Sequence, residues 1–436
     1  MPFLINSFKN ILIHGSGKII LFLLLVFLTN TLVTTEFADY ILFLNLFSLS
    51  LLFSTLGIPQ YIIRSIKNGN ANFYKIIFLS LLINLALSFI FILVVIFYSR
   101  ISLNLSYEFL FIFFLLSAFN ATLSSILHGF DKVLLSDFLE FFLKPVIISS
   151  ITFLGYLFIV KQIDFNIIFV SYFIGQLVLF TALVLKISKI IKDDFKKIKN
   201  SSEKFQISFF FKSILFLGAS SVLHIFNSRI DIFMINYYLD DNSIATYGLA
   251  LQLFAIVNLP ILAIRSIFIP KFYSLINAKD YNNANSRLNL IKVGIVYLHI
   301  FIIMLMVTVG KEFFILIFDT YYSYAFDLVL FYLLCNIIIV PFLLSEVILH
   351  SVKKEIFIPL YTLVSAVINI FLNIILINLF GIKGALLSTI ICNFLVHFMM
   401  YFSIRKHHKE FKIINFDDFK KFHYSLIKLF KKNVIN

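Results

Sequence analysis

The residues of this sequence whose types and spacing could do chemistry lie in one stretch, His224 to Asp241, which reads HIFNSRIDIFMINYYLDD. Imidazole, amide, guanidinium and carboxylate groups interrupt a run of apolar residues there. At about 100° per residue on a helix, His224, Asn227 and Asp231 fall within about 60° of one another, whereas Arg229 lies near the opposite face. Arg229 and Asp231 therefore cannot form a simple local ion pair. The carboxylate could bind a proton or a cation, and the guanidinium could offset an anion.

The residues around this stretch are those of a membrane protein. Hydrophobic residues make up 61% and charged residues 13% of the 436 residues, and the mean hydropathy is +1.00. Soluble domains average roughly 45–50% apolar and about 25% charged residues. An uncompensated charge at the centre of a bilayer costs about 2.5–3.5 kcal/mol or more. Arg229 and Asp231 therefore each need a separate partner, a water-filled cavity or a route to the interface.

We predict twelve transmembrane helices, because about 20 apolar residues cross a bilayer and a helix satisfies its own backbone hydrogen bonds there. They cover residues 17–35, 40–63, 75–98, 108–127, 138–160, 165–187, 209–238, 244–268, 292–310, 327–350, 356–379 and 384–404. With the amino terminus inside, 29 of the 36 Lys and Arg residues fall in cytoplasmic segments and four in outer loops. This asymmetry predicts that both termini are cytoplasmic, and it accounts for the net charge of +14 without nucleic acid.

The predicted helices divide into two similar halves. Glu36–Phe47, EFADYILFLNLF, aligns with Ser243–Phe254, SIATYGLALQLF, at an offset of 207 residues. Both segments begin an even-numbered helix that runs from outside to inside, as a parallel duplication of six helices requires. We therefore expect an all-α integral membrane protein, with two pseudo-symmetric six-helix bundles around a central cavity. The predicted parts are an N-terminal bundle at 1–187, a basic cytoplasmic linker at 188–208, a C-terminal bundle at 209–404 and a basic, amphipathic cytoplasmic tail at 405–436.

Polar side chains within the predicted spans are the candidates for binding or translocating a substrate. The complete set is Arg229, Asp231, Asn227, His224, Lys144, Arg265, Glu346, Asn369 and Asn373. Each has a structural alternative. Arg229 could snorkel to the outer interface, Lys144 could pair with Glu140 one turn earlier, and Arg265 and Glu346 lie near inner helix ends. The two asparagines, one turn apart, could contact sugar hydroxyls or bond neighbouring helices.

The sequence contains no constellation typical of an enzyme. The nine His are scattered, both Cys fall in apolar spans, and no Gly-rich phosphate loop or Walker-type motif occurs. We therefore expect no catalytic residue, no bound metal and no ATP hydrolysis.

Several blocks resemble the polysaccharide flippases of the multidrug/oligosaccharidyl-lipid/polysaccharide export superfamily, in particular O-antigen (Wzx-type) transporters. Asp231–Leu253 contains an Asp, an apolar run, a short turn and a Tyr-x-x-Ala step. Ile269–Asp280 resembles the Pro-containing cytoplasmic end of helix eight, and Asn373–Thr389 resembles the turn between helices eleven and twelve. Glu36–Tyr61 and Leu127–Phe130 resemble blocks of the first half.

This resemblance implies a flippase in a bacterial cytoplasmic (inner) membrane. Its substrate would be an undecaprenyl-diphosphate-linked oligosaccharide, moved by alternating access, and its partners would be membrane lipid and polysaccharide polymerase machinery. Asp231 could couple the movement to an H⁺ or Na⁺ gradient; no other cofactor is expected.

The alternatives are an ion-coupled multidrug/cation antiporter of the same superfamily and a membrane-embedded polysaccharide polymerase or ligase. The short outer loops argue against the enzyme, and the absence of a paired His or Asp constellation argues against a membrane acyltransferase.

Overall fold

The described part of the protein is entirely helical. The structure, a computed structural model, describes residues 2–68, 72–97, 105–160, 163–194, 206–258, 261, 268–269, 272–318, 320–352, 354 and 356–424. These residues form helices and the turns between them, without a strand among them. The predicted all-α class is therefore confirmed.

The helices form two compact units, Met1–Arg229 and Ile230–Asn436. The division lies inside one helix, α9 (Ile207–Tyr238), because the earlier part of that helix packs on the first unit. Most of the predicted linker, residues 195–205, lies outside the described part. The domain boundaries drawn from the sequence therefore stay predictions.

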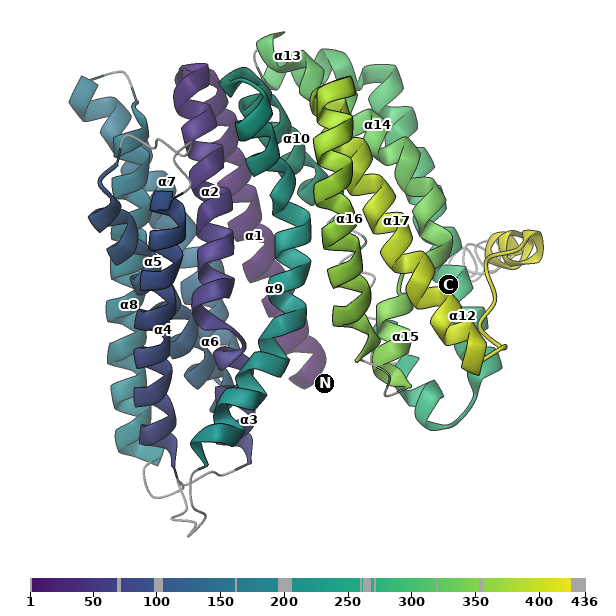
Figure 1. Cartoon of the computed structure of the whole chain (residues 1–436), viewed down its shortest axis with the longest axis horizontal. Helices are drawn as coiled ribbons and strands as arrows, with labels where there is room; N and C mark the ends of the chain where they lie inside the picture. Colours follow the sequence, from purple (N-terminus) through teal and green to yellow (C-terminus); the bar gives the residue numbers. More distant parts are fainter. Residues whose placement is uncertain are drawn as a thin grey trace, which may run out of the picture. The chain divides into compact units, whose positions relative to one another are not determined.

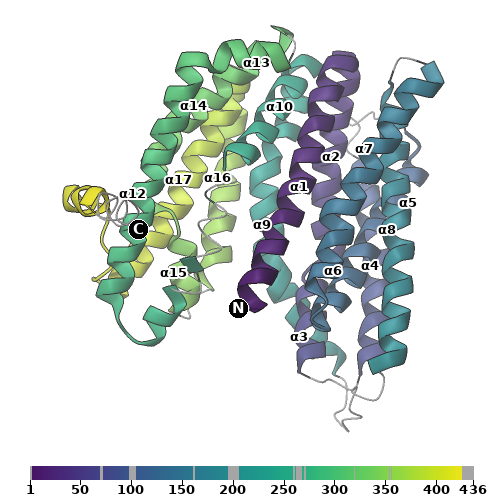
Figure 2. The ribbon, with the colours of Figure 1, turned by 180° about the vertical axis from the view of Figure 1, so that it is seen from behind.

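The first unit is a bundle of long helices with short breaks. Besides α9, its elements are α1 (Pro2–Thr31), α2 (Thr34–Thr55), α3 (Ile58–Lys67), α4 (Phe73–Phe97), α5 (Tyr107–Gly129), α6 (Val133–Asp137), η1 (Phe138–Leu143), α7 (Lys144–Gly155), η2 (Tyr156–Val160) and α8 (Phe165–Asp194). Figures 1 and 2 show α2, α4, α5 and α8 running side by side. The ring of Phe43 on α2 lies 5.2 Å from that of Phe113 and 5.6 Å from that of Phe169, which gives this bundle an aromatic core.

A tight turn in the first unit breaks the predicted span 40–63. Leu56 and Gly57 adopt positive φ angles of 36° and 81°, which end α2 and begin α3. Pro59 follows in the first turn of α3. Backbone N–H groups in a first turn make no hydrogen bond within the helix, so proline, which has no N–H, is tolerated there. The backbone of α9 passes close to this turn: a Cβ added to Gly218 would lie 2.5 Å from the carbonyl carbon of Leu56. Glycine at 218 therefore allows α9 to approach the turn.

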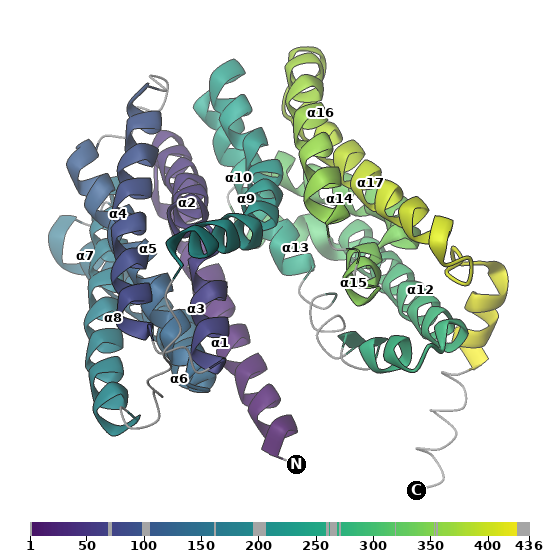
Figure 3. The same cartoon turned by 60° about the horizontal axis from the view of Figure 1, so that its bottom comes forward.

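The second unit is also a helical bundle. Besides the end of α9, its elements are α10 (Asp241–Val257), α12 (Tyr281–Leu305), η4 (Met306–Gly310), α13 (Lys311–Ile317), η5 (Thr320–Tyr322), α14 (Ser323–Ile339), η6 (Val340–Phe342), α15 (Ser345–Ser351), α16 (Phe357–Phe380) and α17 (Ile382–His407). Figure 3 shows α16 and α17 side by side, with α14 next to them. Gly381, at φ 59°, makes the one-residue turn between α16 and α17.

The tail after α17 packs on the second unit. The ring of Phe411 lies 6.3 Å from that of Phe272, and the ring of Phe422 stacks 5.5 Å from that of Tyr297 on α12. Residues 416–424 are helical, in line with the amphipathic spacing of the tail. Leu426, Leu429 and Phe430, which continue that spacing, lie outside the described part.

The spans of the structure follow the predicted order. Within the described ranges, ten helical segments are long and apolar enough to cross a membrane, and α9 raises this to as many as eleven if its two parts form one bent span. The remaining prediction, 244–268, corresponds to α10, which has 17 residues; residues 259–260 and 262–267 lie outside the description. The chain is thus a multi-pass membrane protein.

Gly218→Ala is expected to lower the stability of the first unit by about 1–3 kcal/mol, because the added methyl group overpacks the contact between α9 and the Leu56 turn. Gly15→Ala is the matched control, since a Cβ there meets nothing within 4 Å. The measurement is the thermal unfolding of both purified variants in the same detergent. Equal unfolding temperatures would contradict the close approach of α9.

Candidate functional site

Asp231 of α9 lies at the centre of a buried polar cluster in the second unit. The residue is 1% exposed. Its carboxylate accepts hydrogen bonds from the hydroxyl of Tyr247 on α10 at 2.9 Å, from Nδ2 of Asn373 on α16 at 2.9 Å, and from the hydroxyl of Thr389 on α17. Side chains of three further helices therefore converge on one carboxylate.

Asn369 extends this cluster one turn along α16. Nδ2 of Asn373 also donates to Oδ1 of Asn369 at 2.5 Å, and the hydroxyl of Ser388 donates to the backbone carbonyl of Asn369 at 3.2 Å. Both asparagines are fully buried. Within the described part, Oδ1 of Asn373 and Nδ2 of Asn369 have no hydrogen-bond partner. We call Asp231, Tyr247, Asn369, Asn373 and Thr389 the Asp231 cluster.

Two helical hairpins place the residues of the cluster at the same distance from their connecting turns. Asn373 and Thr389 each lie eight residues from the Gly381 turn, so at 1.5 Å per residue both are about 12 Å from it. Asp231 and Tyr247 likewise each lie eight residues from Leu239, between α9 and α10. There the side chain of Asp240 caps α10 by accepting from the backbone N–H of Ser243 at 3.0 Å. The turn positions in the sequence therefore decide which polar residues meet.

The arrangement suits a proton or a small hard cation. A carboxylate buried among apolar helices is stable only when it is hydrogen-bonded and its charge is balanced or neutralised. The Asp231 cluster offers carboxylate, amide, phenol and hydroxyl oxygens, which are the ligands that hard cations prefer. In the described ranges, no group of three or more His, Cys, Asp and Glu side chains is arranged to hold a metal ion.

Arg229 faces away from the Asp231 cluster. Its Nη1 donates to Oδ1 of Asn45 on α2 at 3.1 Å, inside the first unit. Asn45 is itself buried, and its Nδ2 donates to the backbone carbonyl of Ile41 at 2.7 Å. That Arg229 and Asp231 form no local ion pair stays a prediction from helical geometry, because two residues along a helix correspond to a turn of about 200°.

The remaining predicted residues are spread over both units. Asn227 is buried on α9; His224 lies on the same helix, but its side chain lies outside the described part. Arg265 is also outside the described residues. Glu346 on α15 has its Oε1 3.9 Å from Nε2 of His350, near the cytoplasmic end that the sequence predicts.

Lys144 is the first residue of α7. Its side chain lies against Gly175 of α8, because a Cβ added to Gly175 would be 3.6 Å from Cγ of Lys144. Glu140, the possible local partner of Lys144, accepts from the hydroxyl of Ser124 at 3.0 Å, and its charge still acts on Lys144. Residues 138–143, which include Glu140 and end just before Lys144, are π-helical.

Sequence reasoning missed two members of the Asp231 cluster, Tyr247 and Thr389. A signal for Tyr247 was present, because the 207-residue offset aligns it with Tyr40. Tyr40 is buried too, and its hydroxyl lies 3.1 Å from that of Tyr172. Thr389 ends one of the blocks on which the family resemblance rests.

A second polar cluster in the first unit was also missed. The carboxylate of Asp137 lies 3.3 Å from Nε2 of His14 on α1 and 3.1 Å from Nε2 of His128 on α5. The Asp137 side chain is 6% exposed. Because 123 residues separate His14 from Asp137, no local spacing could indicate this contact.

A multi-pass helical chain with ionisable and amide side chains buried in its spans is typical of membrane transporters. The model of the family described as "Polysaccharide biosynthesis protein" matches residues 3–276, which is more than half of the chain. The chain therefore belongs to this family. No curated protein matches the sequence.

Solved structures with the same fold are transporters and flippases. The lipid II flippase MurJ in an inward closed conformation has a TM-score of 0.66 at 16% identity, with 99% of this chain and 93% of that chain covered. An inward-facing multidrug resistance MATE family transporter of the MOP superfamily has a TM-score of 0.64 at 13% identity, with 91% and 94% covered. A mutant of the Vibrio cholerae MATE transporter VcmN has a TM-score of 0.60 at 13% identity, with 93% and 99% covered.

These findings confirm the resemblance stated from the sequence at the level of family and fold.

Tyr247→Phe is expected to destabilise the protein by about 1.5–3 kcal/mol, because it removes a buried hydrogen bond to a charged group. The loss should shrink by at least about 0.5 kcal/mol when Asp231→Asn is already present, because the two residues interact directly. Thermal unfolding of the two single variants and the double variant measures this coupling, with Tyr107→Phe, at an exposed residue, as the control. Additive losses would mean that the two side chains do not interact.

Proposed function

We propose that this protein flips an undecaprenyl-diphosphate-linked oligosaccharide from the cytoplasmic to the outer leaflet by alternating access. The buried Asp231 cluster, in a chain of the polysaccharide biosynthesis protein family, is the observation that carries the proposal. A lipid II flippase among the proteins of the same fold supports a lipid-linked substrate.

A multi-pass protein with polar groups in its spans is suited to moving such a substrate across the hydrocarbon. The polyprenyl tail is soluble in the hydrocarbon, whereas the sugar diphosphate carries charge and hydroxyls that resist entry into it. A transporter must therefore provide polar contacts to the headgroup alone. The amides of Asn227, Asn369 and Asn373 can replace hydration of sugar hydroxyls.

Arg229 and Asp231 take separate roles in this proposal. The guanidinium of Arg229, with Lys144 and Arg265 as further cations, offsets the charge of the diphosphate. Asp231 binds the coupling ion, either a proton or Na⁺, and alternates between an ion-bound and an ion-free state during the cycle. Their placement on opposite faces of α9 keeps the anion and the coupling ion apart.

The proposed setting follows from the charge asymmetry and the substrate. We place the protein in a bacterial cytoplasmic membrane with both termini in the cytoplasm. The substrate would be the repeat unit of an O-antigen or a related surface polysaccharide, and the flipped product would be consumed by polysaccharide polymerase machinery.

An ion-coupled multidrug antiporter is the second candidate, favoured by the multidrug transporters that share the fold. The two functions separate in a deletion strain. Loss of a flippase leaves lipid-linked repeat units on the cytoplasmic side, whereas loss of an antiporter leaves them unchanged and reduces extrusion of cationic dyes.

Arg229→Ala, in a correctly inserted protein, is expected to abolish surface polysaccharide in the complemented deletion strain, while Arg229→Lys retains part of it. The reason is that Lys keeps the positive charge but loses the planar geometry of the guanidinium. Arg287→Ala, at an exposed position of α12, is the control and should complement fully. Full export by the Arg229→Ala protein would remove Arg229 from the substrate path.

Asp231→Asn is expected to remove the dependence of flipping on an ion gradient, because the amide keeps the size of the side chain but cannot change its charge. Reconstituted vesicles with an imposed proton or Na⁺ gradient measure this dependence. The gradient that accelerates the wild type should have no effect on the variant. An equal response of both proteins would dismiss Asp231 as the coupling residue.

A further inference from the structure

The first unit contains an open cavity of about 850 Å³, separate from the Asp231 cluster and the other candidate residues. It lies where the α1–α2 junction meets the α7–α8 junction, and with the predicted orientation this is the outer end of the unit. Its residues are Thr31, Val33, Glu36, Ile151, Leu154, Gly155, Phe158, Ile163, Asp164, Asn166, Ile167 and Val170. The volume falls within the range of small-molecule sites, about 300–1,000 Å³.

Most of the cavity wall is apolar and reaches the exposed surface of the helices. Phe158 is 80% exposed, and Leu154 and Val170 are each 49% exposed. In a membrane-spanning bundle, such side chains at this height contact acyl chains rather than water. The cavity therefore suits the apolar part of a molecule that arrives from the bilayer.

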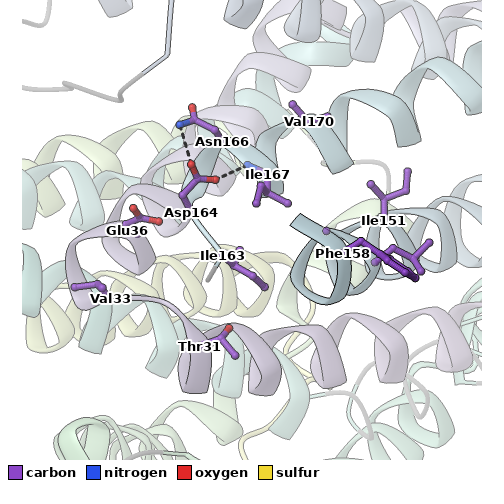
Figure 4. A pocket seen from close by; sticks show the side chains of 12 residues that line it. Thr31, Val33, Glu36, Ile151, Phe158, Ile163, Asp164, Asn166, Ile167 and Val170 are labelled. Carbon is purple, nitrogen blue, oxygen red and sulfur yellow. Dashed lines mark hydrogen bonds between the residues drawn. The ribbon is translucent and has the colours of Figure 1, made fainter. Parts of the chain in front are cut away.

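One end of the cavity is acidic. Figure 4 shows Glu36 and Asp164 next to each other, with Asn166 beside them and Phe158 at the other side. The position of Asp164 is fixed by the start of α8, because its carboxylate accepts from the backbone N–H of Ile167 at 3.0 Å and from Nδ2 of Asn166 at 3.4 Å. The carboxylate of Glu36 accepts a hydrogen bond from the backbone N–H of Phe165, while its Oε2 is buried and has no hydrogen-bond partner within the described part of the chain.

The two carboxylates favour a cation. Like charges repel more strongly in surroundings of low dielectric constant than in water, and a buried carboxylate oxygen without a partner costs free energy. None of the described residues that line the cavity is basic. A positively charged group with N–H donors would satisfy both carboxylates at once.

The lining selects a primary ammonium over a quaternary one. A primary ammonium donates three hydrogen bonds, which match carboxylate and amide oxygens. A quaternary ammonium donates none and is usually held by several aromatic rings, whereas Phe158 is the one aromatic residue among the described lining residues. We propose that this cavity binds a membrane phospholipid with a primary amine headgroup, such as phosphatidylethanolamine, with its ammonium between Glu36 and Asp164 and an acyl chain along Ile151, Leu154 and Phe158. The bound lipid ties the α1–α2 junction to the α7–α8 junction.

Binding of four lipids with identical acyl chains tests this proposal: phosphatidylethanolamine, its N-methyl and N,N-dimethyl forms, and phosphatidylcholine. They keep one positive charge while the number of N–H donors falls from three to none. Native mass spectrometry of the purified full chain measures the affinity of each. We expect the affinity of the wild type to fall with every methyl group. An affinity independent of methylation would overturn the proposal.

Glu36→Gln is expected to lower the affinity for phosphatidylethanolamine about tenfold and to weaken the dependence on methylation. Asp164→Asn, which keeps a side chain able to cap α8, is the second variant and should act in the same direction. Glu108→Gln, an exposed carboxylate in the first turn of α5, is the matched control and should bind like the wild type. Wild-type affinity in both Glu36→Gln and Asp164→Asn would contradict the site.

Two further measurements test which group of the lipid is recognised. Lys161 precedes Asp164 by three residues in the sequence, and Lys161→Gln should leave binding equal or tighter. Weaker binding in that variant would mean that Lys161 binds the lipid phosphate. Displacement of the lipid by an equal concentration of a single-chain alkylamine would show that the site takes any apolar amine, and the lipid assignment would be wrong.

Discussion

The second unit depends on one constraint, which is that the carboxylate of Asp231 must be kept within apolar helices. Three donors from α10, α16 and α17 meet it, so the polar residues of four helices are fixed by a single group. Because such a carboxylate carries a full charge unless an ion or proton binds it, its surroundings are sensitive to ion binding in a way that an apolar core is not. That sensitivity is what a transporter needs in order to link an ion gradient to the movement of helices.

The 207-residue offset relates the residues of the Asp231 cluster to a different arrangement in the first unit. Tyr40 and Tyr247 are equivalent by the 207-residue offset, and both are buried with their hydroxyls hydrogen-bonded. The partner of Tyr247 is a carboxylate, whereas the partner of Tyr40 is the neutral hydroxyl of Tyr172. The same offset aligns Asp231 with Leu24, a buried apolar residue. One architecture therefore supports a neutral pair in the first unit and a charge in the second.

Local patterns predicted the spans, the opposite faces of Arg229 and Asp231, and the stacked asparagines 369 and 373, because all of these follow from helical geometry over a few residues. Long-range contacts could not be predicted in the same way. Thr389 lies 158 residues from Asp231, and only the lengths of the hairpins bring the two together. The turn at Leu56 was missed for a different reason: the apolar run continues through it, so hydropathy gives no sign of a break.

The central claim is that the carboxylate of Asp231 binds the coupling ion, either by taking up a proton or by coordinating Na⁺. Infrared difference spectroscopy of the purified protein tests it most directly, by comparing spectra with and without Na⁺ at constant pH, and at low and high pH without Na⁺. The account predicts a carboxylate band that shifts with one of these ions in the wild type and is missing in Asp231→Asn. Identical difference spectra from the two proteins would contradict it.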